Sequence, residues 1–492
     1  MLMPALRTTL AVAALVAGGL VVAQIALDRQ DTAAVPAPAQ ATREKVRTVP
    51  ASSQQVTLSF APVARAVQPA VVNIFTETVV RDRARMGGFF TLFEGQPRVA
   101  NSLGSGVIVD PAGLVITNNH VVRGADQIIV ALADRREYPA SLVFADARLD
   151  LALLRIDPRG DQLPALRLGD SDRAEVGDLV LAIGNPFGVG QTVTQGIVSA
   201  VARSGLGVSD TQFFIQTDAA INQGNSGGAL VAINGELIGI NTAILTAGAN
   251  AGSIGLGFAI PSNMVRVFLE ASRSGKLVTA WLGAEGEPLT SDTARAAGLD
   301  RPAGVLMTGV SPGSPAARAG LRPGDIILAV DGKETPDPAS LRYRIATLGV
   351  GQTVTVSVLR DRRRLEVALP LAPPPESPPR NLTQLPGGSI LAGVTIGNLS
   401  PAFAQELGAG LPERGVVVVD VPPNAPARVT GFPRAGDVVE AINGESVRNV
   451  ADVVRAIGQG QRQTVLRLNR NGQRADCIFQ PPGRWGCRAA VA

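Results

Sequence analysis

The chain has 492 residues, of which 46% are hydrophobic and 17% charged; this composition excludes a disordered protein and supports roughly three folded domains. Its net charge of +4 is small for this length, and no Lys/Arg run is interleaved with aromatic residues, so a nucleic-acid partner is not indicated. His120 is the only histidine, which excludes a metal centre built from several histidines.

The N-terminus has the pattern of an export signal, because Arg7 precedes an apolar run from Leu10 to Leu27. The run is also nearly long enough to span a bilayer, so residues 1–27 are either a cleaved signal peptide or a retained membrane anchor. Either way, the bulk of the chain is expected outside the cytoplasm. Residues 28–57 are rich in Ala, Pro and Gln without periodicity, and predict a flexible tether.

Residues 58–275 alternate short apolar runs with turn residues, for example GSGVIVD, DLALLRI and ELIGINTAI. Strands at this spacing, without long helices between them, predict an all-β domain built as a barrel pair or a sandwich pair. Ser262 fits the N-cap of a short amphipathic helix that leads out of this domain.

Two later segments repeat each other: GVLMTGVSPGSPAARAGLRPGDIILAVDG from Gly304 and GVVVVDVPPNAPARVTGFPRAGDVVEAING from Gly415. Shared Gly, Val and Pro-Ala positions, followed by a Gly-Asp pair, predict a duplicated domain at 276–372 and 389–480. The proline-rich residues 373–388 are expected to form a stiff linker that lets the two copies move semi-independently.

The C-terminal residues 481–492 are expected to form a tail. Cys477 and Cys487, the only cysteines, either close a local disulfide in an oxidising compartment or remain free thiols. They cannot make a structural zinc site, because neither a second cysteine pair nor a second histidine exists.

The segment AAINQGNSGGALV places Ser226 among glycines within an apolar stretch. A serine hydroxyl is a poor nucleophile, so acyl-transfer enzymes give it a base and donors that hold the oxyanion. The turn GNSGG can direct the N–H groups of Gly224 and Ser226 toward one point, and Gly227 and Gly228 lack a Cβ that would obstruct an approaching peptide.

The base must be His120, in LVITNNHVV, because the chain has no other imidazole. The carboxylate that orients it is expected to be Asp150, which directly precedes an apolar strand and can be buried at the strand start. Asp146 and Asp157 are rivals that flank loops and are expected to be solvated. Each signal alone is common in turns and caps; together they indicate a catalytic site.

Four segments carry a specific resemblance: SGVIVDPAGLVITNNHVV, DLALLRI, LAIGNPFGVGQTVTQGIVSA and FIQTDAAINQGNSGGAL. They are similar to those of the HtrA family of Do-like serine endoproteases, and the repeated modules resemble that family's two PDZ domains. The resemblance implies a mainly β fold, with a trypsin-like double β-barrel followed by two PDZ-like α+β domains. It also implies the triad His120, Asp150 and Ser226, a homotrimer or a larger oligomer, a periplasmic location, and no metal or organic cofactor.

By the same resemblance, Asn241, Thr242, Ala243 and Ile244 should line the pocket for the residue before the scissile bond, and NPFG from Asn185 should begin a loop that switches activity. Leu282 and Gly283 of the first PDZ-like module should offer backbone N–H groups to the carboxylate of a peptide C-terminus. The equivalent loop of the second module, LAGVTI, is weaker, so that copy is expected to serve assembly or to lack a visible role. Phe89, Phe90 and Phe93 are expected to lie in the family's long N-terminal loop, either as a packed contact or as a regulatory one.

The sequence is therefore interpreted as that of an ATP-independent serine endoprotease of the cell envelope that cuts unfolded or misfolded proteins after small aliphatic residues. Its rate should fall toward acid pH as His120 gains a proton. Two alternatives remain: a non-catalytic chaperone or PDZ scaffold, and a regulatory protease with one specific partner, held at the membrane by residues 8–27.

Overall fold

The computed structural model describes the following residues, to which every structural statement below refers: 59–80, 98–185, 190–203, 213–222, 224–244, 253, 255–387, 389, 391–408, 411–457, 464–470, 472–480 and 484–489. The expectations for residues 1–27 and 28–57, for Phe89, Phe90 and Phe93, and for the part of the NPFG segment that follows Asn185 lie outside these residues. Within the described part of the chain, no helix combines the length and the hydropathy that crossing a membrane requires.

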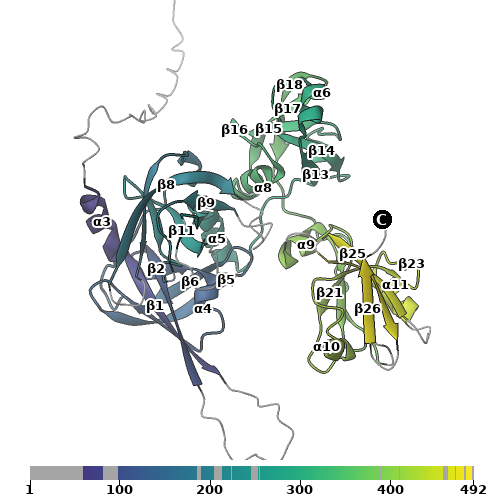
Figure 1. The fold of residues 1–492 in the computed structure, drawn as a ribbon, viewed down its shortest axis with the longest axis horizontal. Helices are drawn as coiled ribbons and strands as arrows, with labels where there is room; N and C mark the ends of the chain where they lie inside the picture. Colours follow the sequence, from purple (N-terminus) through teal and green to yellow (C-terminus); the bar gives the residue numbers. More distant parts are fainter. Residues whose placement is uncertain are drawn as a thin grey trace, which may run out of the picture. The chain divides into compact units, whose positions relative to one another are not determined.

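The first part of the protease region is a closed β-barrel with strand order β1-β2-β3-β6-β5-β4 (Figure 1). Residues that alternate along the strands, such as Ile74, Ile108 and Leu154, fill its interior. Short helices precede β1 and follow β3. The elements are α3 (Ala61–Val67), η1 (Gln68–Ala70), β1 (Val71–Val80), β2 (Arg98–Asp110), β3 (Leu114–Thr117), α4 (Asn119–Val122), β4 (Gln127–Ala131), β5 (Glu137–Asp146) and β6 (Leu151–Ile156).

A second closed barrel follows, with strand order β10-β11-β12-β9-β8-β7. Its elements are η2 (Ser171–Arg173), β7 (Leu179–Gly184), β8 (Thr192–Arg203), β9 (Phe214–Thr217), β10 (Ala229–Ala232), β11 (Leu237–Ile244), β12 (Gly257–Pro261) and α5 (Ser262–Ser274). Helix α5 forms where predicted, but its N-cap is Pro261, and the Ser262 hydroxyl donates to the carbonyl of Gly169 instead (2.7 Å).

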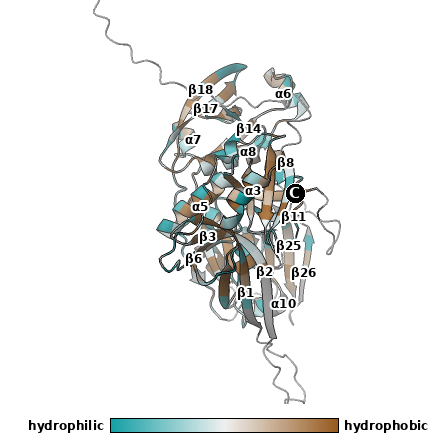
Figure 2. Ribbon diagram, turned by 90° about the vertical axis from the view of Figure 1, so that its left-hand side faces the viewer, coloured by the Kyte–Doolittle hydropathy of each residue, from teal (hydrophilic) through white to brown (hydrophobic). Residues whose placement is uncertain are grey.

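The two barrels share one apolar cluster, in which Val107 and Ile116 of the first barrel pack with Leu181 and Ile183 of the second. The barrel strands are coloured largely as hydrophobic in Figure 2. The predicted pair of β-barrels is thus confirmed, and the shared apolar core packs the two barrels against each other.

The first PDZ-like module has a sheet of order β13-β14-β15-β17-β18, with β16 paired to β15. Helices α7 and α8 begin where a capping side chain precedes proline: Ser314 accepts from the N–H of Ala317, and Asp337 from that of Ser340. The elements are β13 (Ala284–Pro288), α6 (Ser291–Ala297), β14 (Val305–Val310), α7 (Pro315–Arg318), β15 (Ile326–Val330), β16 (Lys333–Glu334), α8 (Pro338–Thr347), β17 (Thr353–Arg360) and β18 (Arg363–Pro370).

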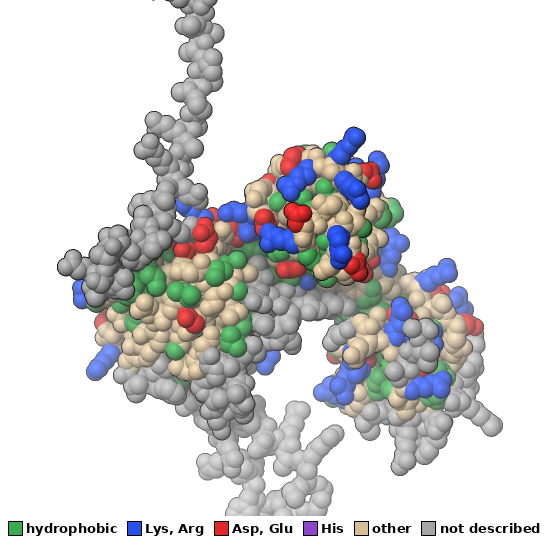
Figure 3. Space-filling view, turned by 45° about the horizontal axis from the view of Figure 1, so that its top comes forward, with side chains coloured by type: hydrophobic (Ala, Val, Ile, Leu, Met, Phe, Trp, Pro, Cys, Tyr) green, Lys and Arg blue, Asp and Glu red, His purple; other side chains and the backbone are tan. Residues whose placement is uncertain are grey.

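The second module repeats this plan with sheet order β19-β20-β21-β22-β24-β25-β26, in which β23 pairs with β22. Its elements are β19 (Thr383–Gln384), β20 (Thr395–Leu399), α9 (Pro401–Leu407), β21 (Gly415–Asp420), α10 (Pro426–Thr430), β22 (Val438–Ile442), β23 (Glu445–Ser446), α11 (Val450–Ile457), β24 (Thr464–Arg470), β25 (Gln473–Gln480) and β26 (Arg484–Ala489). Basic and acidic side chains are interspersed on the face of the molecule shown in Figure 3.

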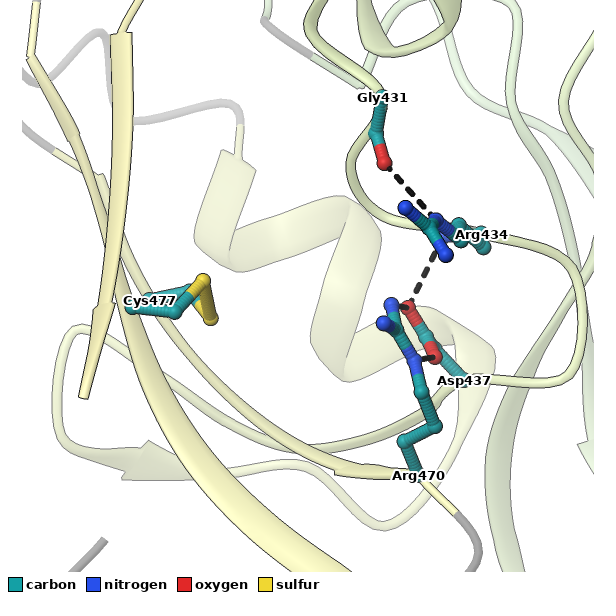
Figure 4. Close-up of a disulfide and its surroundings, with 6 residues drawn as sticks. Gly431, Arg434, Asp437, Arg470 and Cys477 are labelled. Carbon is teal, nitrogen blue, oxygen red and sulfur yellow. Dashed lines mark hydrogen bonds and ion pairs between the residues drawn. A yellow bond between two sulfur atoms is a disulfide. The ribbon is translucent and has the colours of Figure 1, made fainter. Parts of the chain in front are cut away.

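The repeated Gly-Asp pair has the same structural task in both modules. Asp325 and Asp437 are each 1% exposed, and each accepts a two-pronged hydrogen bond from an arginine, at 2.6 and 2.7 Å. The arginines are Arg360 and Arg470, at the ends of β17 and β24 (Figure 4 shows the second pair). A buried carboxylate that is fully paired explains why the Gly-Asp motif recurs in both copies.

Both ends of the second module differ from the sequence-based boundaries. Part of the expected linker 373–388 belongs to this module, because β19 pairs with β20 and the guanidinium of Arg380 bonds to Glu376 and Glu406. Part of the expected tail 481–492 forms β26, which pairs with β25 and is joined to it by the Cys477–Cys487 disulfide (Figure 4). The proline content of residues 373–388 and the terminal position of residues 481–492 predicted unpaired segments. Part of each segment instead forms a paired β-strand.

Candidate active site

His120 and Asp150 meet at the end of the first barrel. Strands β3 and β6 pair with Thr117 opposite Ala152, so the residues that follow β3 lie beside those that precede β6. Nδ1 of His120 lies 2.7 Å from Oδ2 of Asp150. Because a carboxylate only accepts, this contact requires the hydrogen on Nδ1, and in the neutral imidazole the lone pair is then on Nε2. The imidazole is therefore oriented with its basic nitrogen free for a reacting group.

Asn118, Asn119 and His120 each donate a hydrogen bond to Asp150. The Asp150 carbonyl accepts from the backbone N–H of Asn119 (3.1 Å) and from Nδ2 of Asn118 (3.0 Å), and its Oδ1 accepts from the backbone N–H of His120 (3.0 Å). Asp150 has φ 53°, a left-handed conformation that is uncommon outside glycine but that aspartate and asparagine adopt more often than other residues. The side chain of Asp150 is 17% exposed and that of His120 is 46% exposed, so the orienting group is shielded while the base faces the solvent.

The two rival carboxylates have other partners. Asp146 is paired with the guanidinium of Arg148 and accepts from the backbone N–H groups of Arg148 and Leu149. Asp157 accepts from the backbone N–H of Arg159 (2.9 Å) in an exposed turn. The geometry thus favours Asp150 over both.

Ser226 lies in a tight turn between β9 and β10 of the second barrel. Within this turn, the Asn225 N–H donates to the Asn222 carbonyl (3.0 Å) and the Gly228 N–H donates to the Asn225 carbonyl (2.9 Å). Gly224 and Gly227 have φ values of 99° and 83°, which side-chain-bearing residues rarely adopt.

The glycines after Ser226 have a reason that the sequence did not reveal. A Cβ on Gly227 would lie 2.0 Å from the Ser105 carbonyl oxygen, and one on Gly228 would lie 2.2 Å from the Ile183 carbonyl oxygen. These residues are glycine because neighbouring strands approach the turn closely, rather than to clear a path for a peptide. The turn is packed against both barrels.

Thr242 connects the two halves of the site. It is the extra residue of a β-bulge in β11, between Asn241 opposite Ala259 and Ala243 opposite Phe258, and bulges often redirect a side chain next to an active site. Its Oγ1 donates to Oδ2 of Asp150 (2.8 Å), and its carbonyl accepts from the Ser226 hydroxyl (3.0 Å). Hydrogen bonds therefore join Ser226, Thr242, Asp150 and His120 in one chain. Sequence reasoning placed Thr242 in the substrate pocket and missed this link.

Ser105, in β2 of the first barrel, is a second residue that sequence reasoning missed. It is fully buried, and its hydroxyl donates to the Gly224 carbonyl (2.6 Å) while accepting from the backbone N–H of Asn185 (2.8 Å). Its backbone N–H donates to the Ser226 carbonyl (2.8 Å). One residue thus holds both ends of the tripeptide Gly224–Ser226. The available signal was a serine flanked by glycines directly before the apolar run Val107–Val109.

The remaining predicted pocket residues lie in β11. Asn241 is fully buried, and its Nδ2 donates to the Ala229 carbonyl (3.0 Å), which ties β11 to β10. Ala243 and Ile244 pair with Phe258 and Gly257 of β12. The assignment of these residues to the substrate pocket stays a prediction.

In the first PDZ-like module, Leu282 and Gly283 form the predicted turn before β13. Gly283 has φ 68°, and its carbonyl accepts from the N–H of Ser311 (2.9 Å). The turn opens into an apolar groove, whose lining includes Leu282, Leu341 and Ile345. An apolar groove beside an end strand and a glycine turn has the form that accepts an extended peptide.

Comparisons with known protein families match this organisation. Residues 104–240 match the trypsin-like peptidase domain, and residues 280–371 and 417–470 each match a PDZ domain. The matched ranges include strands of both barrels and of both repeated modules.

Relatives extend the match over most of the chain. The periplasmic serine endoprotease DegP of Salmonella typhimurium is 43% identical over 378 residues, which are 76% of this chain and 75% of that protein. The periplasmic pH-dependent serine endoprotease DegQ of Escherichia coli is 39% identical over 423 residues, which are 84% of this chain and 90% of that protein. A solved structure, the HtrA-type protease AlgW with decapeptide, is 43% identical, covers 65% of this chain and 99% of its own, and has a TM-score of 0.48. This chain therefore belongs to the HtrA family and is a DegP-like serine endopeptidase with two PDZ domains.

Proposed function

We propose that this protein is a periplasmic quality-control protease in which Ser226 is the nucleophile, His120 the general base and Asp150 the residue that orients it. The observation that carries the proposal is the chain of hydrogen bonds that joins Ser226, Thr242, Asp150 and His120 across the two barrels. Isolated turn or cap residues have no reason to converge in this way.

The reaction follows from the positions of these groups. The Ser226 hydroxyl exchanges the Thr242 carbonyl for Nε2 of His120 as its acceptor, gives up its proton, and attacks the scissile carbonyl carbon. The N–H groups of Gly224 and Ser226 are proposed to hold the resulting oxyanion. His120 then protonates the leaving amine, and a water molecule, deprotonated by the same imidazole, hydrolyses the acyl-enzyme. A protonated imidazole cannot accept the serine proton, so the rate should fall toward acid pH.

The substrates are proposed to be unfolded or misfolded proteins that are cut after small aliphatic residues, with Asn241 to Ile244 contributing the pocket. The groove at Leu282 and Gly283 would take up peptide C-termini in extended form. The names of DegP and DegQ support the periplasmic location. A homotrimer is the assembly that the family resemblance supports.

A direct test compares the parent protein with Ser226→Ala on an unfolded, casein-like substrate. Ser262→Ala is the matched control, since it removes a fully buried hydroxyl that bonds to a backbone carbonyl within the same domain. The parent and Ser262→Ala should release fragments, and Ser226→Ala should release none. Fragments from Ser226→Ala would refute the proposal, and so would an inactive parent that only suppresses aggregation, as a chaperone or scaffold would.

A further inference from the structure

The two PDZ domains differ at the strand edge where a peptide would bind. In the first domain, β13 is the end strand of the described sheet and borders the groove formed with α8. The corresponding strand of the second domain is β20, because each of these strands pairs with the strand that opens the repeated segment, β14 or β21. The edge of β20 that faces away from β21 is already paired with β19.

Strand β19 runs as a bound peptide would run. It is antiparallel to β20, with Thr383 opposite Ile396 and Gln384 opposite Thr395. The ladder continues at Leu385, whose N–H donates to the Val394 carbonyl (2.9 Å) and whose carbonyl accepts from the Gly393 N–H (2.9 Å). PDZ ligands add a strand in this manner, and backbone N–H groups of the adjoining loop receive their terminal carboxylate. The Leu385 carbonyl takes the place of that carboxylate.

Leu385 is also buried in the apolar core of the second domain, between the strand and the helix that would border a bound peptide. It is 2% exposed and belongs to the cluster that contains Ile396 of β20 and Val450 and Val453 of α11. The neighbouring Leu382 is 56% exposed, so the burial is specific to the residue at the end of the added strand.

The segment before β19 is fastened to the same domain. The guanidinium of Arg380 bonds to Glu406 of α9 (2.8 Å) and lies 4.4 Å from the ring centroid of Phe403. The Arg380 carbonyl accepts from the N–H of Asn398 in β20 (2.6 Å). The strand is thus held at both ends, which gives it a high effective concentration at the groove.

We propose that Thr383–Leu385 is a built-in ligand of the second PDZ domain, so that its groove is closed and only the first domain takes up peptide C-termini. This inference rests on the proposed peptide-binding role of the first domain. It assigns the proline-rich segment a function beyond that of a linker, because the segment supplies an apolar side chain and a β-strand to the groove that follows it.

The test uses the full chain carrying Ser226→Ala, so that peptides are not cut, and a decapeptide that ends in Thr-Gln-Leu with a free carboxylate. Calorimetric titration should give one binding site per chain, and the same peptide with an amidated C-terminus should not bind. Leu385→Ala should expose a second site, while Leu382→Ala, which truncates the exposed neighbour, should leave one. Two sites in the parent would overturn the inference, and so would a single site in a folded Leu385→Ala variant.

Hydrogen exchange gives an independent reading that does not require Leu385→Ala to fold. The Leu385 amide should exchange at the same rate with and without saturating peptide, and so should the Gly393 amide. Faster exchange of the Leu385 amide on peptide addition would show displacement of β19 and would contradict the inference. If the parent binds no peptide while Leu385→Ala binds one equivalent, the role of the first domain fails and the built-in ligand stands.

Discussion

The two barrels of the protease domain contribute unequally to the site. The first barrel holds His120 and Asp150 largely by itself, through hydrogen bonds from Asn118, Asn119 and the backbone of His120 to Asp150. Among the described residues of the second barrel, Thr242 donates a hydrogen bond to this pair. The proposed base and its orienting carboxylate are therefore positioned mainly by local structure.

The second barrel carries Ser226, the proposed nucleophile, but the turn that holds Ser226 depends on the first barrel. Ser105 bonds to the carbonyls of Gly224 and Ser226, and its own carbonyl leaves no room for a Cβ on Gly227. Thr117 in turn donates to the Ser105 carbonyl (2.7 Å). The comparison teaches that the turn with the proposed nucleophile and the proposed oxyanion donors is positioned from across the barrel interface. If the proposal holds, activity should respond to contacts that leave the three proposed triad residues intact.

The largest effect should follow from changing the orienting carboxylate of the first barrel. Asp150→Asn keeps the shape, but its one amide oxygen is needed to accept from the backbone N–H of His120. Its amide nitrogen then faces Nδ1 and favours the wrong tautomer of the imidazole, so kcat should fall on the order of 10⁴-fold. The matched control is Asp157→Asn, an exposed aspartate that accepts a hydrogen bond from the backbone N–H of Arg159. Activity on an unfolded substrate should change less than about twofold in the control. Equal losses in the two variants would remove Asp150 from its role.

A smaller but more diagnostic loss of activity should follow from removing the hydrogen bond between Ser105 of the first barrel and the Gly224 carbonyl of the second. Ser105→Ala removes the hydroxyl that holds the Gly224 carbonyl, so kcat should fall about 10- to 100-fold with little change in KM, because misplaced oxyanion donors act on the transition state. The pH profile should keep its position, since His120 and Asp150 are untouched. Ser262→Ala loses an equally buried hydroxyl and should keep its kcat. Equal kcat values in the two variants would show that the hydrogen bond from Ser105 to Gly224 is only structural.

Sequence reasoning could find the parts of this site whose chemistry leaves few choices. The single histidine leaves His120 as the one candidate for an imidazole base, and the position of Asp150 directly before a strand favours it as the partner that the structure places 2.7 Å from His120. Ser105 and Thr242 could not be assigned, because their tasks arise from a strand packed across the barrel interface and from a bulge within β11. The same limit applies to the second PDZ domain, where proline content concealed β19 and chain position concealed β26.

The smallest effect is expected on the surface of the first barrel, away from the interface. A hydrogen bond from Arg136 holds the pKa of Asp134 below its ordinary value. A carboxyl with a lowered pKa in the folded state stabilises the protein above its unfolded pKa of about 3.9, and this contribution disappears as the pH falls through the folded value. Both side chains are about half exposed, so Asp134→Asn should lower Tm by about 1 °C or less at pH 7. The difference from the parent should vanish at the acid end of the range; a constant difference at every pH would contradict this origin.

The central claim is that Ser226 becomes reactive because it shares one cleft with His120. Labelling of the folded parent with a serine-reactive fluorophosphonate, followed by intact mass and peptide mapping, tests this directly. The account predicts one adduct per chain, located on Ser226, with its rate strongly reduced in His120→Ala. An adduct on another serine, or efficient cleavage of unfolded substrate by a protein that takes up no label, would contradict it.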